Sequence, residues 1–258
     1  MRVALLFAVL ALGACTRAER AAVPESYCKQ QLFKGSRFTV CDNEGGEFLL
    51  FAAGKGSTPV RSFGEVAGQL DVDRVAFGMN AGMFDEEGRA IGLATPTHGS
   101  GHPLNLRDGP GNFHMKPNGV FMVLAGGRPA IFESDKIPEF RAPPGLATQS
   151  GPMLVIDGEL HPRFEPDGRS RYIRNGVGVT ADGKALFVIS QDLVSFGKFG
   201  RFFRDALKTP NALYFDGSVS SLWDPANGRQ DSHVPLGPMI IALKPAESAP
   251  GREGRATP

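Results

Sequence analysis

The chain is organised around residues 211–223, whose sequence is Asn-Ala-Leu-Tyr-Phe-Asp-Gly-Ser-Val-Ser-Ser-Leu-Trp. The apolar run from Ala212 to Phe215 predicts a short buried strand, and Asp216 follows where the strand gives way to Gly217 and small hydroxyl residues. A carboxylate at such a strand end has rigid support behind it and open space in front of it, as catalytic and ligand-binding groups need. An isolated Asp-Gly pair more often makes only a turn. We favour a functional Asp216 because other polar residues have the same placement.

Polar side chains also occur at the ends of other predicted strands. Asn80 follows the buried run 75–79, Arg174 and Asn175 precede the strand 177–180, and Asp192 follows the strand 185–189. The segment 92–119 has neither helical nor strand periodicity, and its polar residues are Asn105, Arg107, Asp108, Asn112, His114, Lys116 and Asn118. Long loops inside compact domains are commonly functional. We expect this loop to be ordered, because it also carries anchoring apolar side chains.

The cations in these segments suit an anionic ligand. An arginine before a strand is, taken singly, more often a surface cation, but Arg174 with Arg107 and Lys116 can bind a phosphate, because guanidinium groups match phosphate oxygens in bidentate geometry. The sequence has neither a P-loop nor a dinucleotide fingerprint, and no Gly-x-Ser-x-Gly elbow. His98 and His102 lie among Gly and Pro, so we do not expect them to share a helix face. No cofactor is predicted, and a divalent metal stays open.

Composition predicts a β-rich fold. The formal charge of +1 argues against a nucleic-acid surface, which shows as a basic excess, and 33 Gly with 20 Pro indicate many turns and short elements. We therefore expect an α+β fold: one β-rich domain of mixed sheets with a few short helices, over residues 27–243, followed by a flexible tail over 244–258. The best helix, 199–207, lies between two apolar strands and predicts a strand-helix-strand crossover.

The N-terminus predicts export. Residues 1–14 have the charged start and short apolar core of a signal peptide, too short to span a membrane, and Leu12-Gly13-Ala14-Cys15 resembles a bacterial lipoprotein signal. We expect a periplasmic, outer-membrane lipoprotein with lipid on Cys15, a tether over 15–26 and no other membrane contact; an ordinary cleaved signal is the alternative. Cys28 and Cys41 then predict a disulfide, with two free buried thiols as the alternative, beside a hairpin of strands 37–40 and 47–51.

Several blocks in this order resemble the phosphodiester glycosidase family, which includes the enzyme that removes N-acetylglucosamine from a sugar-1-phosphodiester. The resemblance covers roughly residues 30 to 243, and the matching blocks are 80–84, 103–113, 116–121, 149–154, 174–178 and 215–218. It implies a hydrolase that cleaves the glycosyl bond of a sugar-1-phosphodiester, acting on a sugar-phosphate small molecule or an envelope glycopolymer.

The resemblance also implies roles for individual residues. Asp216 is expected to be nucleophile or base, and Arg174, helped by Arg107 or Lys116, to neutralise the departing phosphate. Asp108 and Asp192 are the candidates for a second carboxylate. The residues expected to bind substrate are Asn80, Arg107, Asn112, Lys116, Asn118, Ser150, Asn175, Gly217 and Ser218.

Two departures keep the substrate open. Ser218-Val219-Ser220 replaces a Gly-rich run after the aspartate of the animal branch, and Asn175 stands where Thr commonly follows the arginine. These features indicate a bacterial branch, so the identity of the sugar is not carried over. Two other functions also stay open: a non-catalytic lipoprotein that binds envelope glycans, and a metal-dependent phosphodiesterase that cuts the P–O bond.

Overall fold

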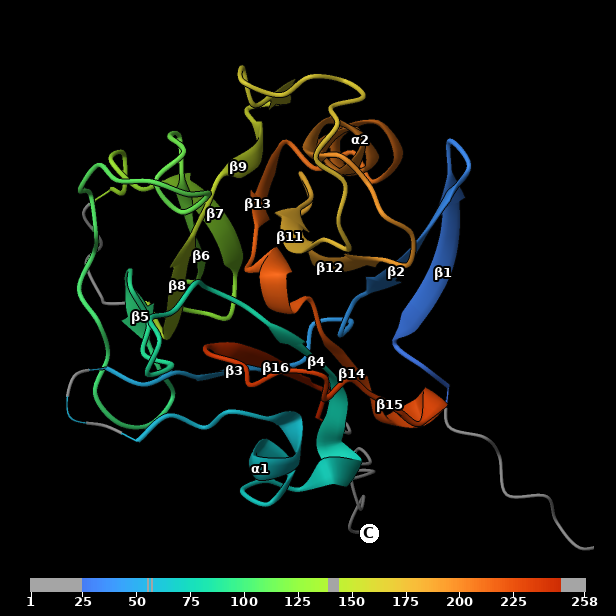
Figure 1. Cartoon of the computed structure of the whole chain (residues 1–258). Helices are drawn as coiled ribbons and strands as arrows, with labels where there is room; N and C mark the ends of the chain where they lie inside the picture. The colour runs from blue at the N-terminus through green and yellow to red at the C-terminus, as the bar shows by residue number, and fades with distance from the viewer. Residues whose placement is uncertain (1–24, 55, 57, 139–143, 247–258) are drawn as a thin grey trace, which may run out of the picture.

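The structure, a computed structural model, describes residues 25–54, 56, 58–138 and 144–246. In this part of the chain the strands form three sheets, each with antiparallel neighbours, and the helices are few and short (Figure 1). The predicted α+β, β-rich fold with short helices is confirmed, although the sheets are antiparallel where mixed sheets were expected. The predicted signal peptide, Cys15 and most of the predicted tether and tail lie outside the described residues.

A seven-stranded sheet combines the first two strands with the strands between residues 153 and 214. Its order is β1 (Cys28–Phe33), β2 (Ser36–Cys41), β12 (Ala185–Ser190), β11 (Asn175–Val179), β13 (Asn211–Tyr214), β9 (Met153–Ile156) and β10 (Glu159–Leu160). An Asp-Gly pair between two apolar runs is typical of a hairpin, and Asp157-Gly158 and Asp182-Gly183 indeed join β9 to β10 and β11 to β12.

Two smaller sheets complete the domain. The five-stranded sheet has the order β15 (Arg229–Gln230), β14 (Leu222–Asp224), β4 (Val75–Asn80), β16 (Met239–Leu243) and β3 (Phe48–Phe51). The four-stranded sheet has the order β5 (Ala94–Thr95), β8 (Leu146–Ser150), β6 (Gly119–Val123) and β7 (Pro129–Glu133).

The helices cap and cross the sheets. Ser62 caps α1 (Phe63–Ala67) by accepting a hydrogen bond from Glu65 N at 3.2 Å, as the Ser-x-x-Glu pattern predicts. Helix α2 (Phe196–Arg201) continues as a π-helical turn (Phe202–Ala206) and connects β12 with β13. The predicted crossover is therefore present, and it passes over β11, which lies between the two strands it connects. Single 3-10 turns cover Val72–Arg74, Gly217–Val219 and Pro225–Asn227.

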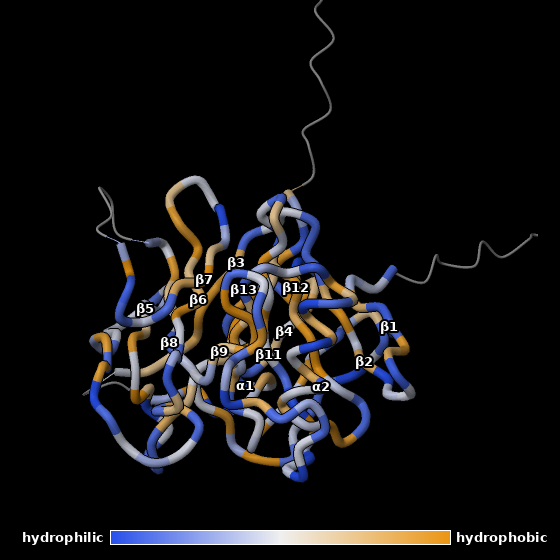
Figure 2. The backbone as a smooth tube through the Cα atoms, turned by 90° about the horizontal axis from the view of Figure 1, so that it is seen from above, coloured by the Kyte–Doolittle hydropathy of each residue, from blue (hydrophilic) through white to orange (hydrophobic). Residues whose placement is uncertain are grey.

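The main core lies where the three sheets meet. Phe187 of β12 is fully buried, and its ring lies within 6.2 Å, centroid to centroid, of Phe48, Phe77, Phe121 and Phe215 from all three sheets. Hydrophobic residues accordingly follow the central strands in Figure 2, and hydrophilic residues follow the surrounding loops. A second cluster packs α2 against the other face of the seven-stranded sheet. Side chains alternate between the two faces of a strand, so in β13 Leu213 packs in the main core and Tyr214 packs on the α2 side.

The start of the chain corrects one prediction and confirms another. Strands β2 and β3 do not form a hairpin, because β2 pairs with β1 and β12 while β3 pairs with β16 in a different sheet. The Cys28–Cys41 disulfide is present and joins directly opposed residues of β1 and β2. By closing a short loop it stabilises the fold by about 3 kcal/mol.

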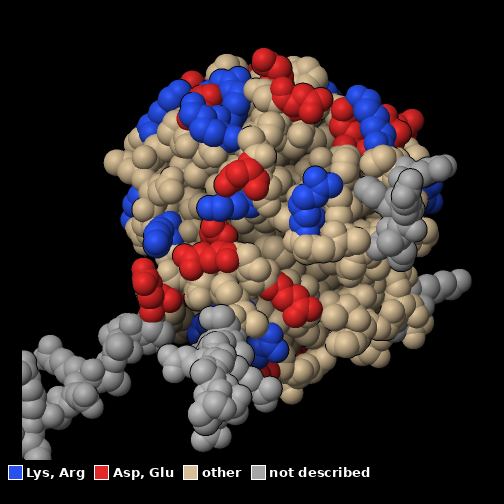
Figure 3. Space-filling model, turned by 180° about the vertical axis from the view of Figure 1, so that it is seen from behind, with Lys and Arg blue, Asp and Glu red and all other residues tan. Residues whose placement is uncertain are grey.

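The surface carries both signs of charge. On the face drawn in Figure 3, acidic and basic side chains are interspersed, in keeping with the formal charge of +1. Among the described residues no helix has the length and apolar character needed to cross a membrane.

Candidate active site

Antiparallel pairing brings Arg174 and Asp216 to the same edge of the seven-stranded sheet. Arg174 directly precedes β11, and Asp216 follows β13 by two residues. In the β11–β13 ladder Gly176 lies opposite Tyr214, and the Phe215 N–H continues the pairing by donating to Asn175 O at 3.1 Å. Extending this register by one more residue places positions 174 and 216 beside each other. Two segments far apart in sequence therefore converge here because of strand register.

The Arg174 guanidinium is a buried cation without an acidic partner. The residue is 1% exposed. Its Nε donates to Val194 O (2.9 Å), Nη1 to Tyr214 Oη (3.2 Å), and Nη2 to Ser170 O (3.1 Å) and Ser170 Oγ (3.3 Å). Within the described part of the chain, no carboxylate lies within 4.0 Å of this guanidinium. Nη1 has two N–H groups but makes only this one hydrogen bond among the described residues.

Aromatic rings and burial define the environment of this cation. The guanidinium carbon lies 3.6 Å from the ring centre of Phe196, and 5.4 and 5.5 Å from those of Tyr214 and Tyr172. Burial lowers the pKa of Arg174, yet an arginine with its very high ordinary pKa remains charged at neutral pH. A desolvated cation held by neutral oxygens and ring faces attracts an anion strongly.

Asp216 is partly buried and sits on a tight turn. It is the N-cap of the 3-10 turn Gly217–Val219, where its Oδ1 accepts a hydrogen bond from Ser218 N at 3.1 Å. Its backbone is held on both sides, since its N–H donates to Ala81 O (3.0 Å) and its carbonyl accepts from Asn80 Nδ2 (2.7 Å). Burial raises the pKa of the Asp216 carboxyl, and the Ser218 N–H opposes part of that rise.

Tyr214 connects the two charged groups. Its hydroxyl accepts the hydrogen bond from Arg174, and a Cβ built on Gly217 would overlap that same oxygen. The pKa of the Tyr214 phenol is raised by burial and, less strongly, by the negative charge of Asp216, while Arg174 opposes the rise. Tyr214 therefore contacts both Arg174 and Gly217, and Gly217 directly follows Asp216 in the chain.

The amides of Asn80 and Asn175 hold the loop that carries Asp216. Asn175 Nδ2 donates to Asn80 O and Asn80 Oδ1, both at 2.9 Å, and its Oδ1 accepts from Ser220 Oγ at 3.1 Å. Asn80 Oδ1 also accepts from Ser221 N at 2.8 Å. Both residues are buried and their amide groups are engaged. These two residues were predicted to bind substrate. In the structure their amides instead hold the backbone of the loop that carries Asp216.

A cavity of about 740 Å³ opens beside these residues. Four of the predicted site residues line it: Asn112, Arg174, Gly217 and Ser218. Asp216 is not itself a lining residue; it directly precedes Gly217 and caps the turn Gly217–Val219, whose residues all line the cavity. The other lining residues are Ser170, Tyr172, Ile173, Leu193, Tyr214, Val219, Ser220, Ser221, His233 and Val234. This volume is in the range of small-molecule sites.

Both candidates for a second carboxylate lie outside the lining of this cavity. Asp108 is almost fully exposed and pairs with Lys116 at 2.6 Å. Asp192 pairs with Arg37 at 2.8 Å, and this arginine lowers the pKa of Asp192 to about 2. A carboxyl with so low a pKa is ionised at neutral pH and is a poor proton donor.

Four further predicted residues also lie elsewhere. The Lys116 ammonium donates hydrogen bonds to Asp108 and to Leu106 O (2.9 Å). The exposed Arg107 donates a hydrogen bond to the side chain of Asn105. Asn118 is buried and donates to Phe113 O at 2.8 Å, within the long loop. Ser150 is fully buried in β8, and its hydroxyl has no hydrogen-bond partner among the described residues. None of the four is part of the cavity lining.

Sequence reasoning missed several residues that line the cavity. Tyr214 lies in the stretch 211–223, and strand alternation after Leu213 indicates that its side chain faces away from the main core. Ser170 and Tyr172 lie just before Arg174, so proximity in sequence was a usable signal for them. For His233 and Val234, which lie on the loop between β15 and β16, the sequence has no such signal.

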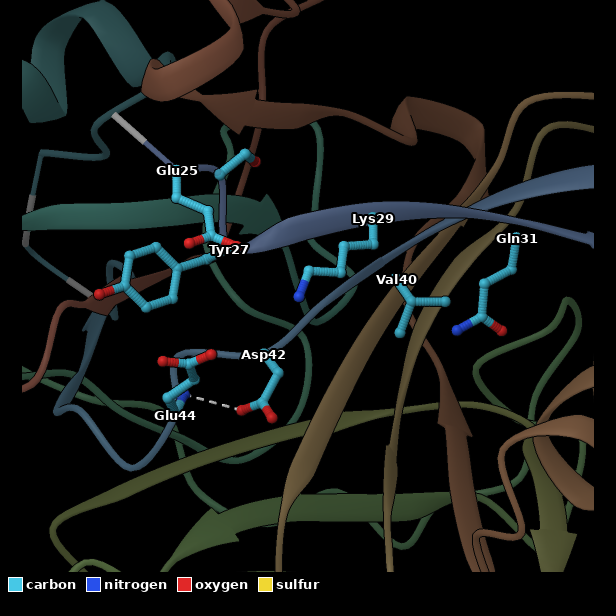
Figure 4. A pocket seen from close by; sticks show the side chains of 8 residues that line it. Glu25, Tyr27, Lys29, Gln31, Val40, Asp42 and Glu44 are labelled. Carbon is cyan, nitrogen blue, oxygen red and sulfur yellow. Dashed lines mark hydrogen bonds between the residues drawn. The ribbon is translucent and has the colours of Figure 1, made fainter. Parts of the chain in front are cut away.

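A second hollow lies beside β1 and β2. Its volume is about 250 Å³, and Figure 4 shows the acidic side chains of Glu25, Asp42 and Glu44 around it with Lys29 as its cation. Asp42 is fixed there as an acceptor, since its Oδ1 accepts from Glu44 N at 2.8 Å. Three carboxylates against one ammonium disfavour a phosphate ligand. Among the described residues no group of three or more His, Cys, Asp or Glu is arranged to hold a metal ion.

The contact between Gly217 and Tyr214 leads to a first prediction. In Gly217→Ala the new methyl overlaps the Tyr214 hydroxyl, so the turn or the phenol must shift, at a cost of about 1–3 kcal/mol in unfolding free energy. We also expect a loss of activity, because the shift displaces both Asp216 and Arg174. Chemical denaturation and turnover measure the two effects. Gly68→Ala is the matched control, since Gly68 has an ordinary φ of −71° and its nearest neighbour atom would be 3.6 Å away; equal effects of the two changes would contradict this account.

Sequence comparison places the chain among known proteins. Residues 73–239 match the family model described as phosphodiester glycosidase. The chain is 37% identical over 155 residues to an Escherichia coli K12 protein described as the uncharacterized protein YigE, over 58% of each chain. The chain thus matches less than two thirds of the length of that relative.

Structural comparison agrees on the fold. The zebrafish N-acetylglucosamine-1-phosphodiester alpha-N-acetylglucosaminidase catalytic domain, auto-inhibited by its pro-peptide, superposes with a TM-score of 0.59 at 13% identity, over 85% of this chain and 82% of that one. A hypothetical protein from Synechocystis gives a TM-score of 0.49 at 15% identity, over 84% of this chain and 61% of that one. With the family match over most of its length, this chain belongs to the phosphodiester glycosidase family.

Proposed function

We propose that this protein hydrolyses the glycosyl bond of a sugar-1-phosphodiester in the cavity beside Arg174 and Asp216. The observation that carries the proposal is the buried Arg174 guanidinium, which lines the cavity and, in the described chain, lacks an acidic partner and makes only one hydrogen bond from Nη1. An uncompensated buried charge is costly to a fold. A diester phosphate in the cavity would supply the missing negative charge and accept the second Nη1 N–H.

The proposed chemistry uses residues on both sides of the scissile bond. With the phosphate at Arg174, the bond from the anomeric carbon to the phosphate oxygen breaks, and its electron pair stays on that oxygen. The product is a phosphate monoester, whose added negative charge Arg174 stabilises, so a strong proton donor is dispensable. Asp216 supplies a carboxylate for the positive charge that develops on the sugar ring, either as a nucleophile or as the base for the attacking water. Water then provides the new hydroxyl on the sugar.

The raised pKa of Asp216 predicts the dependence on pH. If Asp216 acts as an anion, kcat/KM falls as pH drops through its pKa, which burial raises from the ordinary aspartate value. The same shift means that the folded state binds the proton more tightly than the unfolded state. The stabilising contribution is therefore present below the unfolded pKa and lost as pH rises through the folded pKa.

Two measurements test this pH dependence. In a pH–rate profile we expect the acid limb to lie above the ordinary aspartate pKa. Thermal midpoints of wild type and Asp216→Asn across pH should diverge in favour of the variant as pH rises through that limb. An acid limb within the ordinary range, with a midpoint difference that does not change with pH, would contradict the assignment.

Cleavage in ¹⁸O-water distinguishes the proposed glycosidase from a phosphodiesterase. A panel of glycosyl-1-phosphodiesters that varies the sugar and the alcohol identifies a substrate, which is then hydrolysed in labelled water. Attack at the anomeric carbon leaves the phosphate monoester unlabelled, whereas attack at phosphorus places ¹⁸O in it; mass spectrometry of the phosphate product reads the result. Labelled phosphate would overturn the proposal, and binding without turnover of any diester would favour a glycan-binding protein.

We further propose that the protein is exported and held on the periplasmic side of the outer membrane by lipid on Cys15. Support comes from the sequence of residues 1–15 alone. Labelled palmitate should enter the wild-type protein in its bacterial host and not the Cys15→Ser variant. Label in both proteins would remove Cys15 as the anchor.

A further inference from the structure

Three of the exposed apolar side chains lie at the candidate active site. In the described part of the chain, the large hydrophobic residues that remain exposed are Leu32, Val72, Leu104, Leu106, Tyr172, Leu193 and Val234. Tyr172, Leu193 and Val234 line the cavity, where they are 60%, 61% and 41% exposed. Partly buried Ile173 and Val219 adjoin them in the lining. Single exposed apolar residues need no explanation, but three at the mouth of one cavity do.

The fold brings these residues together from separate segments. Tyr172 forms an isolated antiparallel bridge with Val194, and this register places Leu193 opposite Ile173, which also lines the cavity. Val234 comes from the loop between β15 and β16. The Tyr172 ring centre lies 5.5 Å from the guanidinium carbon of Arg174. We call Tyr172, Leu193 and Val234 the apolar rim. Through Tyr172 the apolar rim comes within one side-chain length of Arg174, the cation proposed to hold the phosphate.

We propose that the alcohol on the far side of the phosphate is apolar, so that the substrate is a sugar phosphodiester of an aliphatic, lipid-type alcohol. This inference rests on the proposed function and specifies its substrate class. Leu193 and Val234 offer only aliphatic surface and no hydrogen bonds, which suits an alkyl chain and does not suit glycerol or a second sugar. The polar part of the lining, which includes Asn112, Ser218, Ser220 and His233, is left for the hydroxyl-rich sugar.

Two phosphates of different chain length test the inference without knowledge of the sugar. Binding of methyl phosphate and of n-octyl phosphate, below its micelle concentration, is measured by calorimetry on the purified wild-type protein. We expect n-octyl phosphate to bind about tenfold more tightly or better, since burial of a few methylene groups on the rim suffices for that ratio. Leu193→Ser should reduce the octyl-to-methyl ratio about threefold or more, and Val234→Thr, which is nearly isosteric, should reduce it in the same direction.

Leu32→Ser is the matched control. Leu32 is 74% exposed on β1, outside the cavity lining, so its removal should leave the ratio unchanged. Equal binding of the two phosphates, or a ratio that Leu193→Ser and Val234→Thr leave intact, would overturn the apolar subsite while leaving the glycosidase proposal in place. Absence of methyl phosphate binding to the wild type would instead overturn the phosphate site at Arg174, and the subsite with it.

Discussion

Asp216→Asn is expected to lower the release of free sugar from a glycosyl-1-phosphodiester by about 10²–10⁴-fold, the range found when a positioned acid–base group is lost. The amide keeps the size of the side chain and an oxygen that can accept the Ser218 N–H, so the turn should persist. What it removes is the negative charge beside the anomeric carbon. Steady-state kinetics and the thermal midpoint together separate the loss of chemistry from a loss of folding.

Asp71→Asn is a matched control for this change. Asp71 is likewise the N-cap of a 3-10 turn and accepts a hydrogen bond from the backbone N–H two residues on, at 3.1 Å, but no residue of its turn lines the cavity, whereas Gly217, Ser218 and Val219 do. We expect it to keep full turnover. Retained turnover in Asp216→Asn would remove Asp216 from the mechanism, and equal losses in both variants would assign the effect to the turn.

Arg174→Met should lower kcat/KM by about 10²–10³-fold, because the charge on the departing phosphate then develops without its counter-charge. The expected effect on stability is small. Exchange of an unpaired buried cation for an apolar chain of similar length is favourable. The loss of the guanidinium opposes that gain, because it removes the hydrogen-bond donor of Val194 O, Ser170 O and Tyr214 Oη. A buried acceptor left without a donor destabilises the fold by about 1–3 kcal/mol. The two terms offset, so the thermal midpoint should move by only a few degrees.

Arg37→Met provides the comparison for Arg174→Met. Arg37 is an exposed arginine that pairs with Asp192 outside the cavity lining, and an exposed ion pair contributes little to stability. We expect normal kinetics and methyl phosphate binding from this variant, and loss of both from Arg174→Met. Unchanged kcat/KM in Arg174→Met would show that the guanidinium is structural.

The local parts of the fold could be predicted from the sequence. An Asp-Gly pair between two apolar runs specifies a hairpin from residues close together in the chain, and β9–β10 and β11–β12 form as expected. The Ser62 cap is local in the same way. The hairpin expected for residues 37–51 failed because Asp42–Gly46 carries the chain from one sheet to another. Strand β3 pairs with β16, from the far end of the chain, and no local pattern specifies that partner.

The site could be predicted only in part, for a related reason. Asp216 and Arg174 were identifiable because each lies at the end of an apolar strand, and their convergence follows from the register of β11 and β13. The charged residues of the long loop were expected to bind the substrate, but they lie outside the cavity lining. The sequence shows that Lys116 is a cation but not that its ammonium already donates to Asp108 and Leu106 O. Asn80 and Asn175 were correctly placed at strand ends, yet their amides support the loop, which only the hydrogen bonds reveal.

The most direct test of the central claim is a crystal structure of Asp216→Asn with a sugar phosphodiester that the wild-type enzyme hydrolyses. The account predicts an intact diester in the cavity, with a phosphate oxygen within hydrogen-bond distance of Arg174 Nη1 and the anomeric carbon facing the side chain at position 216. A phosphate held instead by Arg107 and Lys116 on the long loop, with the cavity beside Arg174 free of the diester, would contradict it.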